Sequence, residues 1–176
     1  MKIVIRPAKI SDALGIATVH VKTWKNAYKD QIPDSYLNSL SIDEKTKSWE
    51  NQLRNPYKGS HAFVAEVDEL VVGWCTGGIS RDEDSFKETG ELYGIYILPD
   101  YIGKGLGTKL MDKLLATLKD EKYTKATLWV LETNEKTRKW YESKGWKVEG
   151  TSKVDKRDGF DLHEIRYVID LRSISI

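Results

Sequence analysis

Cysteine is almost missing from this sequence, which has 176 residues and a single thiol at Cys75. One cysteine excludes a disulfide framework within the chain and any zinc site built on several thiolates. Histidine is nearly as rare, because the chain has three scattered histidines. Since thiolates and imidazoles are the usual ligands of transition metals, we expect no metal centre.

Long hydrophobic runs and an excess of one charge are missing as well. No run of about 18 apolar residues occurs, and such a run would be needed to predict a membrane-spanning helix. The 28 Lys and Arg residues nearly balance the 27 Asp and Glu residues, which leaves a net charge of +1. This balance argues against nucleic acid or an anionic membrane as the main partner. We therefore expect a soluble, reduced, cytoplasmic protein.

The overall amino-acid composition is typical of one globular domain over residues 1–176. The hydrophobic fraction is 40% and the charged fraction 31%, close to the averages of globular proteins. The length suits a single domain of ordinary size. We find no internal repeat and no low-complexity tract.

Hydrophobic periodicity predicts strands alternating with helices. Apolar residues at helical spacing indicate helices, and alternating or β-branched runs indicate strands. The predicted helices cover residues 12–28, 42–55, 106–118 and 134–143, and a further helical stretch begins at Pro33. The predicted strands cover residues 2–6, 62–67, 70–79, 91–98, 127–131, 147–154 and 162–171. This order predicts a mixed sheet with helices on both faces, which places the chain in the α/β class.

Three alternating glycines, Gly103, Gly105 and Gly107, lie between a predicted strand and a predicted helix. Glycine tolerates a positive φ and has no Cβ, so backbone N–H groups there can converge on an anion at the helix N-terminus. The same glycines also suit a tight turn that binds no ligand. Neither the P-loop pattern nor G-x-G-x-x-G fits this segment. If the turn binds a phosphate, the ligand is therefore of another kind.

The wider context of this turn resembles a known family. Residues 91–107, ELYGIYILPDYIGKGLG, resemble the acetyl-CoA signature of the GNAT N-acetyltransferase superfamily. Residues 128–146, LWVLETNEKTRKWYESKGW, resemble the family's Asn-to-Tyr helix and its glycine ending, and the resemblance extends over residues 3–171. It implies a GNAT-like acyl-CoA N-acyltransferase fold, with a central, mostly antiparallel sheet flanked by helices. It also implies transfer of an acetyl group from acetyl-CoA to an amine.

The resemblance assigns the cosubstrate acetyl-CoA to two segments of the chain. Backbone groups of Ile95, Tyr96 and Ile97 are expected to bond the pantetheine arm as an added strand would. The pyrophosphate is expected on the amides of Gly103, Lys104, Gly105, Leu106, Gly107 and Thr108. Ile102 stands where the family usually has Arg or Gln. Because the implied phosphate contacts are made by the main chain, we expect this departure to weaken affinity and not to abolish function.

Asn134 and Tyr141 are seven residues apart in a predicted helix, so they share one face. The resemblance assigns Asn134 to cofactor contact and Tyr141 to the thiolate leaving group. A phenol with a reference pKa of about 10 can protonate an alkyl thiolate at neutral pH, which makes Tyr141 a candidate general acid. The alternatives are that Asn134 only caps the helix and that Tyr141 is a core residue.

An amine must lose a proton before or during attack on a thioester. Glu91 matches a position that holds a glutamate general base in some family members, and its alternative is a solvated carboxylate at a strand end. Water could also accept the proton without any single base. His163 is a weaker candidate, since a lone histidine is more often structural.

The sequence leaves the acceptor amine open. Aromatic and acidic residues in the helices after the first strand and in the loop 81–90 suit a cationic amine. A small-molecule amine, with a polyamine among the options, and a protein amine both fit. Two alternatives also stay open: a non-catalytic acyl-CoA-binding module, and an acyltransferase that uses another acyl-CoA. Besides the acceptor, the partner we consider is a second copy of the chain, in a homodimer.

Overall fold

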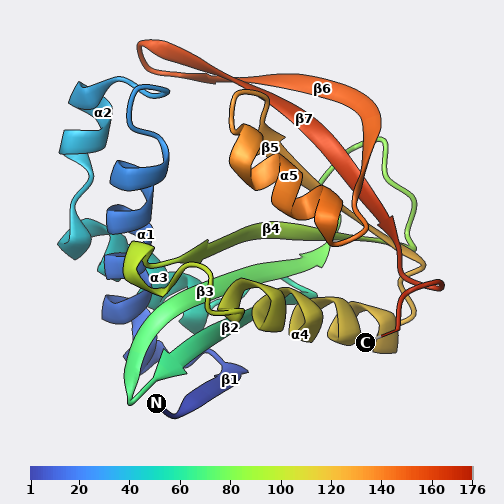
Figure 1. The fold of residues 1–176 in the computed structure, drawn as a ribbon, viewed down its shortest axis with the longest axis horizontal. Coiled ribbons are helices and arrows are strands. Elements are labelled where there is room, and N and C mark those ends of the chain that lie inside the picture. Colours follow the sequence, from blue (N-terminus) through green and yellow to red (C-terminus); the bar gives the residue numbers. More distant parts are fainter. Residues whose placement is uncertain (176) are drawn as a thin grey trace.

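Seven strands form one twisted sheet in the computed structural model, which describes residues 1–175 (Figure 1). The strands are β1 (Ile3–Pro7), β2 (Ser60–Val67), β3 (Leu70–Ile79), β4 (Thr89–Ile97), β5 (Lys125–Leu131), β6 (Lys147–Arg157) and β7 (Phe160–Asp170). Their order across the sheet is β1-β2-β3-β4-β5-β7-β6. All neighbouring pairs are antiparallel except β4 with β5, which run parallel. The predicted mixed sheet is confirmed.

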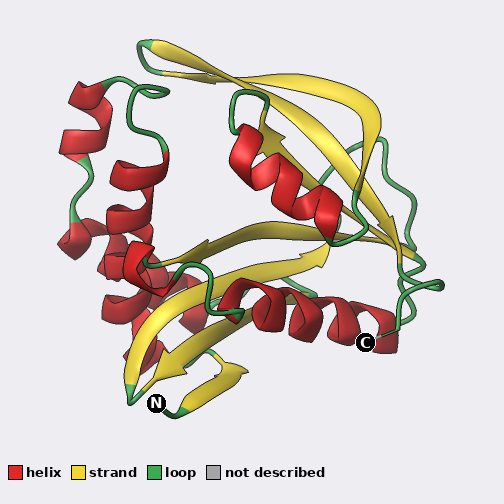
Figure 2. Cartoon of the chain, viewed as in Figure 1, coloured by secondary structure: helices red, strands yellow, loops and turns green. Residues whose placement is uncertain are grey.

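Five α-helices flank this sheet (Figure 2). They are α1 (Ala13–Ala27), α2 (Asp34–Ser39), α3 (Ile42–Arg54), α4 (Leu106–Asp120) and α5 (Glu135–Ser143). Each predicted helix and strand is present, and the bounds differ from the prediction by a few residues. None of the helices that the structure describes is long and apolar enough to cross a membrane.

The two faces of the sheet bury separate hydrophobic cores. Residues alternate between faces along a strand, so Cys75 of β3 joins the core under α4 while its neighbour Trp74 joins the core under α1 and α3. The apolar face predicted for α4 is fully buried and comprises Leu106, Leu110, Met111, Leu114, Leu115 and Leu118. Burying each such side chain contributes roughly 1.5–3 kcal/mol. These cores fix α1 and α4 on opposite faces of the central strands.

A third set of contacts ties the loop after β3 to the β6–β7 hairpin. The Arg166 guanidinium donates to Asp84 at 2.7 and 2.8 Å and to Glu149 at 3.0 and 3.1 Å. It also donates to Asp82 at 3.1 Å, and the Arg166 side chain is only 8% exposed. The hydrogen bonds from Arg166 lower the pKa of the Asp84 and Glu149 carboxyls. Arg166 therefore ties this polar loop to β6 and β7.

We expect Arg166→Met to lower the melting temperature at pH 7 by roughly 5 °C or more, because it leaves carboxylates clustered without their cation. Asp84 and Glu149 have folded pKa values below their unfolded values, so their contribution is present above pH ~4 and is lost as the pH falls through the folded values. The difference between the two proteins should narrow at pH 3. Thermal denaturation at both pH values measures it.

The matched control is Arg172→Met, which removes an exposed arginine paired with Asp170. Exposed ion pairs contribute little, so this variant should unfold like the wild type. A difference between wild type and Arg166→Met that is as large at pH 3 as at pH 7 would contradict the proposed role of the carboxylates.

Candidate active site

The sheet opens where β4 and β5 stop pairing. The two strands pair in parallel only over Thr89–Leu92 and Lys125–Leu128, although β4 continues to Ile97 and β5 to Leu131. The register of β4 against β3 also shifts next to Tyr93, and such a bulge bends a strand. Beyond Leu92, β4 therefore presents a strand edge that β5 does not cover. An extended ligand can form main-chain hydrogen bonds with such an edge.

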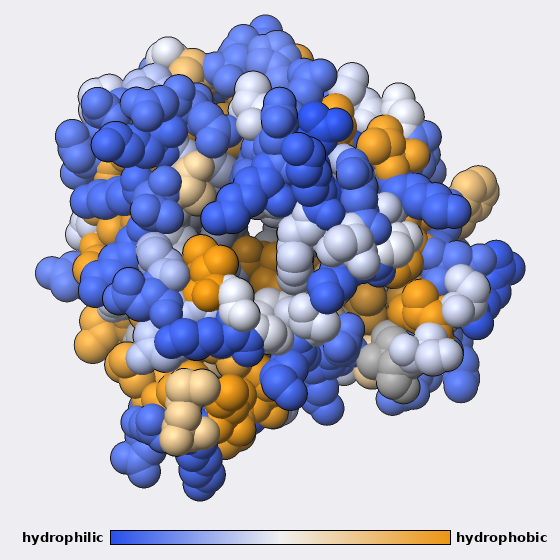
Figure 3. All heavy atoms as spheres, in the orientation of Figure 1, coloured by the Kyte–Doolittle hydropathy of each residue, from blue (hydrophilic) through white to orange (hydrophobic). Residues whose placement is uncertain are grey.

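A cavity of about 1310 Å³ fills the space between the separated strands. Figure 3 shows the surface hollowed near its centre, with hydrophobic and hydrophilic residues both at the edge of the opening. One small-molecule site typically has roughly 300–1,000 Å³. The cavity is therefore large enough for two reactants. Its walls come from the end of α1, from β4 and the turn after it, from β5 and α5, and from β6 and β7.

The glycine turn lies at one end of this cavity. Gly103 and Gly105 have φ values of +83° and +77°, and a Cβ placed on either would meet no atom within 4 Å. Glycine is thus needed here for the backbone conformation and not for lack of space. Gly105 is the N-cap of α4, and the first turn of α4 contains no acidic residue. The free N–H groups of that turn and the helix dipole favour an anion there.

Most residues assigned to the cofactor line the cavity. They are Ile95, Tyr96, Ile97, Gly103, Gly105, Leu106, Gly107, Thr108 and Asn134. Lys104 is not part of the lining, and its ammonium lies 4.7 Å from the centroid of the Tyr101 ring. The predicted role of Lys104 thus has no support from its side-chain position, and its backbone amide is the group that belongs to the turn.

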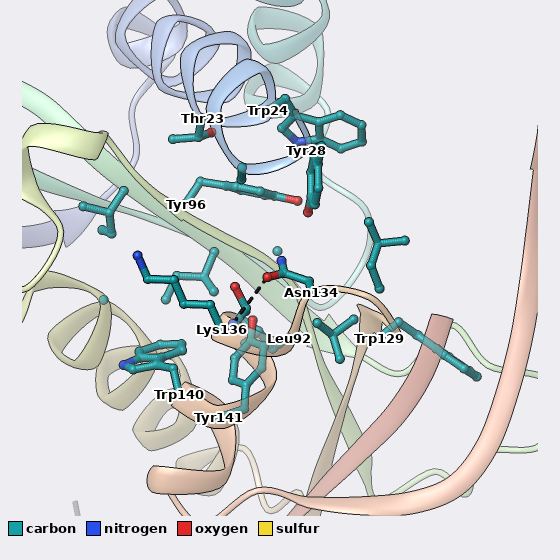
Figure 4. Close-up of a pocket in the computed structure, with 18 of the residues that line it drawn as sticks. Thr23, Trp24, Tyr28, Leu92, Tyr96, Trp129, Asn134, Lys136, Trp140 and Tyr141 are labelled. Atoms are coloured by element: carbon teal, nitrogen blue, oxygen red, sulfur yellow. Dashed lines mark hydrogen bonds between the residues drawn. The ribbon is translucent and has the colours of Figure 1, made fainter. Parts of the chain in front are cut away.

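Asn134 and Tyr141 face the same cavity, as their spacing in the helix predicts. Asn134 is the N-cap of α5, and its Oδ1 accepts a hydrogen bond from the Thr137 amide at 3.3 Å (Figure 4). Capping occupies only the carbonyl oxygen of the Asn134 side chain. The amide nitrogen remains available as a donor, so capping and ligand contact are compatible.

The Tyr141 side chain is 6% exposed and packs beside the rings of Trp140, Trp146 and Tyr167. Its hydroxyl points into the cavity (Figure 4). Burial, followed by the nearby Tyr96 and Cys75, raises the pKa of Tyr141. The phenol is therefore protonated at every pH at which the protein would work. It can donate a proton or a hydrogen bond to a group in the cavity.

Glu91 is buried and ion-paired, so the alternative of a solvated carboxylate at a strand end is wrong. It is 1% exposed and accepts hydrogen bonds from the Arg81 amide at 2.8 Å, from Nη2 at 2.6 Å and from Nε at 3.3 Å. Arg81 in turn lies over the Tyr93 ring at 4.0 Å. Glu91 lines the cavity, and its action as a base stays a prediction. His163 is exposed on β7 and does not line the cavity.

The half of the cavity away from the glycine turn, here called the acceptor half, is richer in aromatic and charged groups. Trp24 and Tyr28 of α1 line it, whereas Trp49 is a core residue and Tyr57 is exposed. The hydroxyls of Tyr28 and Tyr96 face each other (Figure 4). Burial raises the pKa of both phenols. These rings provide a neutral wall on which a cation can pack.

The sequence analysis missed the contribution of the last two strands. Leu162 and Glu164 of β7, with Lys153, Asp155 and Arg157 of β6, line the acceptor half. The sequence did contain a signal for this contribution. Leu162, Glu164 and Arg166 occupy every second position and therefore share one face of β7, and the positions between them also include apolar residues. Charged residues at inward positions of a strand are unusual and mark a candidate site.

Comparison with known proteins agrees with this geometry. The family model described as Acetyltransferase (GNAT) family matches residues 22–146. The uncharacterized N-acetyltransferase YuaI of Bacillus subtilis (strain 168) is 35% identical over 133 residues, which are 75% of this chain and 73% of YuaI.

Two solved structures share the fold over nearly the whole chain. PaiA N-acetyltransferase from Thermoplasma acidophilum, in complex with coenzyme A, has a TM-score of 0.75 at 22% identity and covers 97% of this chain and 99% of its own. YncA from Salmonella typhimurium, a putative acetyltransferase with its cofactor acetyl-CoA, has a TM-score of 0.71 at 20% identity and covers 100% and 98%. The family match and the likeness to YuaI show that this chain belongs to the GNAT family of N-acetyltransferases.

Proposed function

We propose that the protein transfers the acetyl group of acetyl-CoA to a primary amine by direct attack of the amine on the thioester. The observation that carries the proposal is the uncovered edge of β4, which leads directly into the glycine turn at the start of α4. The CoA in the PaiA structure and the acetyl-CoA in the YncA structure support it. The acceptor is an amine of a small molecule, with cationic ones such as polyamines included, or of a protein.

Acetyl-CoA is placed by the main chain in this proposal. Amides of the turn from Gly103 to Thr108 receive the pyrophosphate, because free N–H groups and the helix dipole converge there. The pantetheine arm lies along Ile95–Ile97 and bonds the strand edge that β5 leaves open. The thioester is thereby directed toward the Asn134 amide and the Tyr141 hydroxyl.

Tyr141 acts as the general acid on the leaving thiolate. Attack forms the C–N bond, and collapse of the tetrahedral intermediate breaks the C–S bond, so the sulfur needs a proton. A raised pKa makes Tyr141 a weaker acid than a free phenol. The same burial makes a thiolate at this position more basic, since desolvation penalises both anions. The two changes act in opposite directions on the proton transfer, and the transfer remains feasible.

The family resemblance implies Glu91 as one candidate for the deprotonating group, with water as another route. Arg81 donates to both carboxylate oxygens of Glu91, so an acceptor amine would share these oxygens with the arginine. A thiol-release assay with acetyl-CoA and a panel of amines tests the function as a whole. Measurable acetyl-CoA binding without thiol release from any amine would favour a non-catalytic acyl-CoA-binding module.

Gly105→Asp tests the cofactor position. An aspartate brings a carboxylate to the site of the anion and a Cβ to a backbone with positive φ, so acetyl-CoA affinity should fall at least about 100-fold. Gly159→Asp is the matched control, because Gly159 also has a positive φ and open space around its Cβ but lies outside the cavity. Isothermal titration calorimetry should show normal binding for Gly159→Asp. Normal binding by Gly105→Asp would place the pyrophosphate elsewhere.

Tyr141→Phe tests the general acid. It removes one hydroxyl and keeps the packing against Trp146, so acetyl-CoA affinity should be nearly unchanged while kcat falls roughly tenfold or more. Steady-state kinetics and calorimetry on the same preparations separate the two effects. Tyr123→Phe, at a tyrosine outside the cavity, should keep the wild-type kcat. If the chemical step is shown to limit the rate, an unchanged kcat in Tyr141→Phe would mean that Tyr141 contributes only packing and is not the general acid.

A further inference from the structure

The carboxylates that line the cavity differ in how well they are paired. Asp82 accepts from Arg166 and from the Trp129 indole, and Glu91 accepts three hydrogen bonds from Arg81. Asp155 accepts from Arg157 at 3.0 Å. Glu135 is exposed in the first turn of α5, away from the acceptor half. The remaining carboxylate, Glu164, has no arginine partner among residues 1–175.

Glu164 is held at the acceptor half by the register of three strands. It lies opposite Leu131 of β5 and opposite Lys153 of β6, so the three side chains share one face of the sheet. The Glu164 side chain is 20% exposed, and the Lys153 ammonium is 3.7 Å from its carboxylate, beyond hydrogen-bond distance. That ammonium also lies 4.2 Å from the centroid of the Trp129 ring. Lys153 is therefore shared between a ring and a carboxylate and binds neither tightly.

Glu164 lines the same cavity as Tyr28, Tyr96 and Tyr141, and Leu131, which lies opposite Glu164, belongs to the apolar cluster against which Tyr28 packs. Burial is the main cause that raises the pKa of Tyr28 and of Tyr96, and the charge of Glu164 is the smallest of the causes that act on either phenol. Tyr96 in turn helps to raise the pKa of Tyr141. Glu164, Tyr28, Tyr96 and Tyr141 thus all contribute to the wall of one cavity (Figure 4 shows the three tyrosines). An amine bound between Glu164 and Tyr141 would lie against this wall.

We propose that Glu164 binds the acceptor as its ammonium ion and takes the proton that must leave before the nitrogen attacks. This inference rests on the proposed function. The ammonium donates its proton to a carboxylate oxygen of Glu164, and the free lone pair forms the C–N bond with the thioester carbon. The C–S bond then breaks, Tyr141 gives its proton to sulfur, and the second nitrogen proton restores Tyr141. Glu164 releases its proton to water, so one proton leaves per turnover.

Burial supports this role, because it raises the pKa of the Glu164 carboxyl and makes its anion a better base. The groups that face Glu164 are Lys153 and Arg157 of β6, which lower this pKa, Asp155 of β6, which raises it, and the neutral phenols of Tyr28 on α1 and Tyr96 on β4. The carboxylate is lost as the pH falls through this raised value. Above it, Glu164 is ionised and can accept a proton.

The pH dependence of kcat/KM for a primary alkylamine, measured by thiol release at saturating acetyl-CoA, tests the proposal. The wild type should show a plateau between the pKa of Glu164 and that of the amine, because ammonium and carboxylate are both abundant there. In Glu164→Gln only the free amine can react, so kcat/KM should rise about tenfold per pH unit up to the amine pKa of roughly 10. At neutral pH it should be at least about 100-fold below the wild type.

Three further variants make the outcome specific. Glu164→Asp keeps a carboxylate and should restore part of the plateau. Glu132→Gln changes an exposed glutamate outside the cavity and should behave as the wild type. Acetyl-CoA affinity, measured by calorimetry, should be the same in all of them, which verifies that each protein is folded. Glu91→Gln decides between the two buried carboxylates.

The possible failures are distinguishable. If wild type releases thiol but already shows the tenfold rise per pH unit, or if Glu164→Gln keeps the plateau, Glu164 is not the proton acceptor. Loss of the plateau in Glu91→Gln alone would transfer the role to Glu91 and leave the proposed function intact. No thiol release from the wild type with any amine would overturn the proposed function and this inference together.

Discussion

The early end of the pairing between β4 and β5 is the constraint on which the rest of the site depends. Parallel neighbours need a crossover connection, and here the crossover is α4. A crossover helix begins near the C-terminal end of the strand before it, so the N-terminus of α4 lies where β4 leaves β5. Because pairing stops at Leu92 and Leu128, the open strand edge and the helix N-terminus meet in one cavity. Neither feature alone would bind a long, extended ligand with an anionic end.

Hydrophobic packing on both faces keeps the two halves of the sheet apart. One core fixes α4 and α5 to the sheet, and another fixes α1 and α3 to β2 and β3. A smaller cluster of Ile32, Leu37, Leu131 and Leu162 joins the segment after α1 to β5 and β7. Each buried aliphatic side chain contributes roughly 1.5–3 kcal/mol, so these clusters stabilise the arrangement of the elements around the opening. The opening is therefore a stable feature of the fold.

Structural features that depend on residues close together in the sequence could be predicted from it. The buried face of α4, the glycine turn and the shared face of Asn134 and Tyr141 each follow from spacing within a few turns of chain. The pairing of Glu91 with Arg81 was not predictable, because it depends on how the loop after β3 returns to β4. Glu164 was missed for a similar reason. Its neighbours Leu131 and Lys153 are set by strand register, and no local pattern encodes which strands pair.

Burial favours proton donation at one position of the cavity wall and proton acceptance at another. Desolvation penalises an anion, so it raises the pKa of both the Tyr141 phenol and the Glu164 carboxyl. For the phenol this secures the proton that a leaving thiolate needs, and for the carboxylate it strengthens the affinity for a proton that an ammonium must lose. Glu91 is more deeply buried than Glu164, but the Arg81 guanidinium satisfies its charge. What separates the buried carboxylates is thus their pairing. The charge of Glu164 is only partly compensated, because its side chain is largely buried and the Lys153 ammonium is 3.7 Å away, so a cationic ligand would complete its pairing.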